Sequence, residues 1–99
     1  MTQFVLRWPE SFDEEEATVS AKGYLDGVVV ETKSADYELS FYDPVRLRQD
    51  AELSLANGRL FYVAVNLVII GAVTRRDIER AVESLVAEGL QNKFRANAS

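Results

Sequence analysis

The chain has 99 residues, of which 47% are hydrophobic and 27% charged, and its formal net charge is −5. This length and composition support one hydrophobic core, which argues against a disordered chain and against two domains. Cysteine and histidine are absent, which excludes disulfides, thiol nucleophiles, cysteine-ligated zinc and the usual nitrogen ligand of transition metals.

Acidic residues are concentrated in the first half of the chain. Residues 1–45 have a charge balance of −7, whereas residues 46–99 have a balance of +2. Such asymmetry is typical of solvated acidic loops and also of a face that binds a basic partner. Nucleic acid is not expected as a partner, because the chain is net negative and its arginines form no basic helix with interleaved aromatic residues.

Nothing in the sequence predicts export or membrane insertion. Residues 1–16 contain no basic start, apolar run or small-residue cleavage site, so no secretory signal is identified. The longest apolar stretch, residues 60–73, is shorter than the ~20 residues that a membrane helix needs. A cytoplasmic location without membrane contact is therefore expected.

The first predicted element is a strand at residues 3–8, which Pro9 ends because proline lacks the N–H that a strand ladder needs. The next segment, residues 12–22, is compatible with two structures. Ser11 and Glu14 fit a capping box that would begin a helix there. The β-branched residues inside the segment favour a strand instead, which is the interpretation we prefer.

Residues 24–42 predict a β-hairpin. Two segments rich in β-branched and aromatic residues, 28–32 and 37–41, are separated by a short polar turn. In the second segment apolar and polar side chains alternate, so one face should be buried and the other exposed. The side chains predicted to be buried are Tyr37, Leu39 and Phe41.

A first helix is predicted over residues 44–57. Asp43 is a suitable N-cap because its carboxylate can accept unpaired backbone N–H groups, and Pro44 suits the first helical turn. Polar residues on one side should face solvent, while an apolar face should pack on the sheet. The predicted packing face consists of Leu47, Ala51, Ser54 and Leu55.

The apolar residues 60–73 predict a strand covered on both faces, at the centre of the sheet. A second helix over residues 75–88 should follow, with Thr74 as its N-cap and Gly89 at its end. Its apolar residues recur at intervals of three and four positions, as in a helix with one buried face. They are Ile78, Ala81, Val82, Leu85 and Val86.

Together these elements predict an α+β fold, in which a small, mainly antiparallel sheet carries two helices, residues 44–57 and 75–88, packed on one face. A parallel strand pair around the first helix is compatible with the same order of elements. Residues 1–89 are expected to form a single compact domain. Residues 90–99 are expected to be a partly disordered tail that only Leu90 and Phe94 could anchor.

The sequence contains no motif of a cofactor site or of a common enzyme class, such as a phosphate-binding glycine loop or a nucleophile elbow. We therefore expect no cofactor and no catalytic residue. The acidic run at residues 13–16 could offer oxygen ligands to calcium or magnesium, but it lacks the alternation and the turn glycine of a calcium loop. A solvated turn without metal is the preferred interpretation.

The leading functional hypothesis is a non-enzymatic protein-interaction module, such as an adaptor, inhibitor or immunity-type partner, whose acidic N-terminal half binds a basic protein. An exposed tryptophan and a run of carboxylates would suit such an interface. The candidate interaction residues are Trp8, Asp13, Glu14, Glu15 and Glu16. Homodimerisation through an unpaired strand edge is compatible with this hypothesis.

The alternative hypothesis is a small-ligand or anion-binding protein, which would include an enzyme. Thr74, Arg75 and Arg76 place two guanidinium groups beside the unpaired N–H groups of a helix N-terminus, where phosphate or carboxylate binds well. The two arginines are also spaced for surface ion pairs with Glu79. These ion pairs are the structural interpretation, which we prefer.

Overall fold

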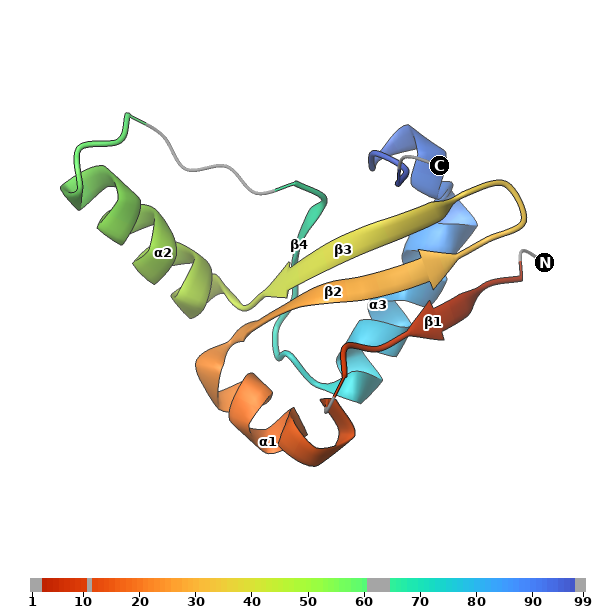
Figure 1. Ribbon diagram of the computed structural model, residues 1–99, viewed down its shortest axis with the longest axis horizontal. Coiled ribbons are helices and arrows are strands. Elements are labelled where there is room, and N and C mark those ends of the chain that lie inside the picture. Colours follow the sequence, from red (N-terminus) through yellow and green to blue (C-terminus); the bar gives the residue numbers. More distant parts are fainter. Residues whose placement is uncertain (1–2, 11, 61–64, 98–99) are drawn as a thin grey trace.

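The computed structural model describes residues 3–10, 12–60 and 65–97, and it shows a four-stranded mixed sheet with helices. The strands lie side by side in chain order and are β1 (Val5–Arg7), β2 (Tyr24–Glu31), β3 (Asp36–Tyr42) and β4 (Leu67–Ile69). The helices are α1 (Phe12–Lys22), α2 (Pro44–Ala56), α3 (Arg75–Glu88) and a short 3-10 helix, η1 (Leu90–Asn92) (Figure 1).

The predicted α+β class with a small, mainly antiparallel sheet is confirmed. Strand β2 pairs antiparallel with both β1 and β3, whereas β3 and β4, which are connected through α2, are parallel. In the described part of the chain, no helix is long and apolar enough to cross a membrane.

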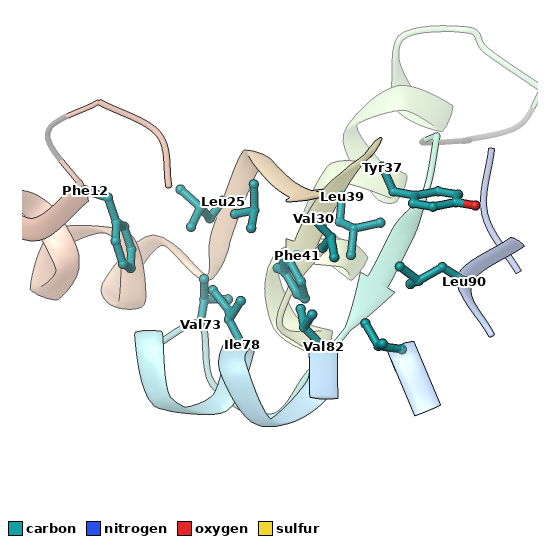
Figure 2. Packing of buried hydrophobic residues seen from close by; sticks show 12 residues of the cluster. Phe12, Leu25, Val30, Tyr37, Leu39, Phe41, Val73, Ile78, Val82 and Leu90 are labelled. Atoms are coloured by element: carbon teal, nitrogen blue, oxygen red, sulfur yellow. The ribbon is translucent and has the colours of Figure 1, made fainter. Parts of the chain in front are cut away.

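The hydrophobic core lies between one face of the sheet and α3. In the β2–β3 hairpin Val28 lies opposite Leu39, so their side chains share the face that α3 covers (Figure 2). The predicted burial pattern of β3 and of the second helix is therefore confirmed. Each such aliphatic side chain contributes about 1.5–3 kcal/mol of stability when fully buried. The largest fully buried side chains are Val28, Val30, Leu39, Phe41, Val73, Ile78 and Val82.

The two predicted N-caps are also confirmed. Asp43 Oδ1 accepts a hydrogen bond of 2.7 Å from the backbone N of Arg46 at the start of α2. Thr74 Oγ1 accepts one of 3.2 Å from the backbone N of Asp77 at the start of α3. These bonds satisfy N–H groups that have no partner inside their own helices.

Residues 12–22 form helix α1, so the strand that we preferred for them is wrong. The helix buries Phe12 in the core and packs Val19 against it. Its first turn carries three acidic residues, which the positive end of the helix dipole stabilises. This stabilisation of the helix outweighs the weak strand preference of the β-branched residues. The predicted capping box depends on Ser11, which lies outside the described residues.

The apolar segment 60–73 does not form a central strand. Its strand, β4, is three residues long and lies at the edge of the sheet. Leu60, Val65 and Ile69 are 91%, 65% and 53% exposed, although Val73 is fully buried. Residues 61–64 of the predicted strand lie outside the described part. Val68 and Ile70 pack against the core, whereas Ile69 between them is more than half exposed, so the described part of the run is not covered on both faces.

Helix α2 lies at the predicted position in the sequence, but it packs less closely than α3. It contains no buried residue, and it projects from the end of the sheet, whereas α3 runs along one sheet face (Figure 1). This projection makes the molecule elongated, with extents of 44 × 30 × 22 Å. The radius of gyration is 14.0 Å, compared with about 13 Å for a compact domain of 100 residues.

The residues that follow α3 pack along the core and the edge of β3. Leu90 is buried and Phe94 packs against the core, so both expected anchors make contact. The backbone N of Asn97 donates a hydrogen bond of 2.8 Å to the carbonyl of Asp36. The side chain of Asn97 in turn accepts one of 3.2 Å from the backbone N of Glu38. These bonds pair Asn97 with the first half of β3, while β4 pairs with the second half.

Candidate functional site

Residues from both functional hypotheses meet where β1 leads into α1 and α1 contacts the start of α3. Trp8 stacks on Phe12, with ring centroids 4.8 Å apart and an angle of 6° between the planes. Arg75 Cζ lies 4.6 Å from the centroid of Trp8 and 5.1 Å from that of Phe12. Each such cation–π contact contributes about 0.5–2 kcal/mol, depending on its exposure.

Two acidic residues of α1 complete this cluster. Asp13 Oδ1 forms an ion pair with Arg75 Nη2, and Glu16 Oε2 accepts a hydrogen bond of 2.8 Å from the backbone N of Arg75. A carboxylate of the chain itself therefore lies at the N-terminus of α3, where the helix dipole favours negative charge. Arg75 pairs with Asp13 rather than with Glu79, the partner that its spacing suggested.

The three predicted anion-binding residues are adjacent, but their donors are largely engaged inside the molecule. Thr74 Oγ1 caps α3, and the backbone N and guanidinium of Arg75 contact Glu16 and Asp13. Arg76 is exposed on the neighbouring position of the helix. An external anion would have to displace Glu16 from the start of α3. The arrangement ties β1, α1 and α3 together.

The four predicted acidic residues divide into two pairs. Asp13 and Glu16 contact Arg75, whereas Glu14 and Glu15 are exposed and form no ion pair with any described residue. In the ranges that the structure describes, no group of three or more potential ligand side chains is placed to hold a metal ion. Glu14 and Glu15 are therefore exposed carboxylates of α1 that are accessible to a partner and pair with no described residue, whereas Asp13 is exposed but pairs with Arg75.

A second candidate surface is the exposed side of α2, which we call the α2 face. Leu53 is 62% exposed, but it lies on a different side of the helix from Leu55, because residues two positions apart do not share a helix face. The α2 face itself presents Val45 and Leu55, which are 65% and 52% exposed. Arg48 and Glu52 lie on the same side, and Arg48 Nε donates a hydrogen bond of 2.9 Å to Glu52 Oε1. This bond raises the pKa of Arg48 above its usual value. Apolar groups clustered on a surface commonly mark an interaction site.

The α2 face was not predicted from the sequence, because Leu55 was assigned to the core and Val45 was not assigned to any face of the helix. A signal was present in the sequence. At 100° per residue, Val45 and Leu53 fall on the side of the helix opposite Leu47 and Ala51, so α2 has apolar residues on all sides. A helix of that kind is normally covered on more than one side.

Helix α2 is held to the rest of the molecule at its N-terminal end. The backbone N of Asp43 donates a hydrogen bond of 2.9 Å to the carbonyl of Gly23. Arg46 Cζ lies 5.3 Å from the ring centroid of Tyr24, and Arg46 Nη1 donates to the carbonyl of Lys22 at 3.4 Å. These contacts fix the start of α2 beside the end of α1, and they leave the last two turns without a buried residue.

A cavity of about 340 Å³ lies where the chain end meets β3. Asn66, in the left-handed backbone region at φ 51°, closes one side of it. Its Nδ2 donates to the carbonyls of Glu38 and Arg95 at 3.0 and 2.8 Å, and its Oδ1 accepts from the backbone N of Arg95 at 2.8 Å. The side-chain amide of Asn66 thus holds the segment around Arg95 beside β3, and all three of its hydrogen bonds go to backbone groups of the chain itself.

Comparisons of the chain with protein-family models, with curated proteins and with solved structures each found no match. Function is therefore inferred from the contacts, exposure and charges of the chain itself.

Proposed function

We propose that the chain is a non-enzymatic protein-interaction module, an adaptor, inhibitor or immunity-type partner, that acts in the cytoplasm. The observation that carries this proposal is the α2 face, on which Val45 and Leu55 are each more than half exposed. An exposed aliphatic side chain forgoes about 1.5–3 kcal/mol relative to full burial. A protein that covered α2 would recover a large part of that free energy.

The accessible carboxylates Glu14 and Glu15 support a second feature of the proposal, a basic partner at α1. The N-terminal half of the chain has a charge balance of −7, and these two side chains add an accessible negative surface to it. Opposite charges attract over about 10 Å at moderate salt, which accelerates encounter more than it strengthens the final complex. We expect α1 to steer a basic partner and the α2 face to hold an apolar one.

No contact among the described residues favours the anion-binding alternative. Glu16 already accepts a hydrogen bond from the backbone N of Arg75, and Asp13 pairs with its guanidinium. A phosphate at this place would be repelled by both carboxylates. The cluster is better explained as a structural junction between α1 and α3.

Photo-crosslinking in the cells that express the protein tests the role of the α2 face. A photoreactive amino acid is placed at Val45 or Leu55, and the control carries it at Glu83, on the exposed side of α3. We expect discrete protein adducts from the two α2 positions and none from the control. The proposal is wrong if the α2 positions give no discrete adduct, or if Glu83 gives the same one.

Charge neutralisation tests the steering role of α1 once a basic partner has been isolated. Glu14→Gln together with Glu15→Gln should lower the association rate several-fold at low salt, and the difference should vanish near about 0.5 M salt. The matched control, Glu79→Gln with Glu83→Gln, changes the net charge equally but on α3. Stopped-flow or surface-plasmon measurements separate the two rates. A larger effect on dissociation than on association would contradict the steering role.

A further inference from the structure

We infer that the α2 face is covered by the α2 face of a second copy of this chain, in an antiparallel helix pair. The inference rests on the proposed function, because it names the partner of the surface assigned there. The exposed charges of α2 and the positions of its apolar residues specify this partner.

The charges of the α2 face complement themselves in one orientation. Arg48 lies in the first half of the helix and Glu52 in the second, and their side chains are 79% and 63% exposed. When two copies of residues 44–56 overlap fully in opposite directions, position 48 of one lies opposite position 52 of the other. Two Arg48–Glu52 contacts between the copies then add to the Arg48–Glu52 pair within each helix, and a twofold axis near the middle of the helix relates them.

A parallel overlap of the two helices would bring like charges together. It would place Arg48 beside Arg48 and Glu52 beside Glu52, and like charges at such spacing repel. It would also align the two helix dipoles, whereas the antiparallel pair places each positive helix end beside a negative one. The charge pattern therefore selects the antiparallel pair.

The apolar residues fit the same register. Full antiparallel overlap places position 45 opposite position 55, so the exposed Val45 of one copy lies near the exposed Leu55 of the other. Each copy thus contributes the same patch, as a closed twofold interface requires.

A second copy also fits this face better than the basic partner proposed for α1. The α2 face carries one cation and one anion, Arg48 and Glu52, so it has no net charge with which to attract a strongly basic protein. Its size points to a weak dimer. A helix of 13 residues is about 20 Å long, and one face of it buries less than the ~800 Å² per partner of a typical stable interface. We expect a dissociation constant on the order of 10–100 μM.

Sedimentation equilibrium tests the inference by exchanging the two charges. The wild-type protein should pass from monomer to dimer between about 10 μM and about 1 mM. Arg48→Glu and Glu52→Arg should each weaken self-association about tenfold or more, because each replaces two attractive pairs by repulsive ones. An equimolar mixture of the two variants should dimerise again. Arg76→Glu, an exposed change of the same charge on α3, should have little effect.

Engineered cysteines test the orientation, because the chain contains no cysteine of its own. Under mild oxidation, a mixture of Val45→Cys and Leu55→Cys proteins should form a disulfide between the two variants, whereas Val45→Cys alone should not form a dimer readily. A parallel pair would give the reverse pattern. Circular dichroism at low concentration checks that each variant keeps the wild-type fold.

A wild-type protein that stays monomeric up to about 1 mM overturns the inference, as does a variant mixture that fails to associate. If Leu55 then crosslinks to a different protein in cells, that protein occupies the α2 face, and the proposed interaction function stands without the dimer. If Leu55 gives no discrete adduct either, the proposed function is wrong as well.

Discussion

Arg75 shows what can and cannot be predicted at the scale of a residue. Its place at the start of a helix follows from the sequence, because Thr74 is a good N-cap and apolar residues recur regularly after it. Its partners do not follow, because Glu16 lies 59 positions earlier in the chain and no local spacing indicates such a contact. The predicted interaction residues and the predicted anion-binding residues are far apart in the sequence, and the fold brings members of both groups into one cluster.

We predict that Arg75 contributes to stability through its charge. Arg75→Met keeps most of the apolar stem but removes the ion pair and the cation–π contacts, so it should lower the free energy of unfolding by about 1–2 kcal/mol. Arg76→Met, at the exposed neighbouring position, should lower it by less than about 0.5 kcal/mol. Urea unfolding of both variants measures the difference. Equal losses would show that the cluster with Trp8 and Phe12 adds no stability.

Gly23 offers a second prediction at this scale. Its φ is 73°, and a Cβ there would collide with the carboxylate of Asp43 at the junction between α1 and α2. Gly58 also has positive φ, 92°, but its Cβ would meet nothing within 4 Å. Both changes to alanine should cost about 1–2 kcal/mol for the left-handed backbone. Gly23→Ala should cost more by at least about 1 kcal/mol. Thermal unfolding of the two variants compares them, and equal costs would place Asp43 further from Gly23.

At the scale of elements, prediction succeeded where several signals agreed. Helix α3 has an N-cap, a C-terminal glycine and one apolar face, and strand β3 has strict alternation, so both were predicted correctly. Helix α1 combines an acidic first turn with β-branched residues, and those signals conflict. Helix α2 was predicted at the correct position in the sequence, but the spacing of its apolar residues could not show that some of them are exposed. A pattern shows which residues are apolar, and it does not show whether this chain provides something to cover them.

The difference in burial between α3 and α2 can be measured as a difference in the free energy of unfolding of two variants. Ile78→Ala removes part of a fully buried side chain of α3, so it should lower the free energy of unfolding by about 2–5 kcal/mol. Leu53→Ala, at an exposed position of α2, should change it by less than about 0.5 kcal/mol in dilute protein. Denaturant unfolding at about 0.5 μM, well below the expected dissociation constant, is the appropriate measurement. A comparable loss for Leu53→Ala would mean that α2 packs inside the monomer.

At the scale of the whole molecule, the exposed apolar residues share one origin. The connection from β3 through α2 to β4 joins parallel strands, and the helix of such a connection normally packs on the sheet. Here α2 projects away, and Val45, Leu53, Leu60 and Ile69 are all more than half exposed along this connection. The projection of α2 and the exposure of Val45 and Leu55 on it are both explained if a second copy supplies the missing cover of the α2 face.

Amide hydrogen exchange in α2 tests this claim most directly. A short helix with no buried residue is marginal by itself, so at about 1 μM, where the monomer predominates, its amides should exchange far faster than those of α3. At about 1 mM, where the dimer predominates, exchange in α2 should slow several-fold while exchange in α3 stays the same. Unchanged exchange in α2 at the two concentrations would contradict the account, because no second copy would then be covering the helix.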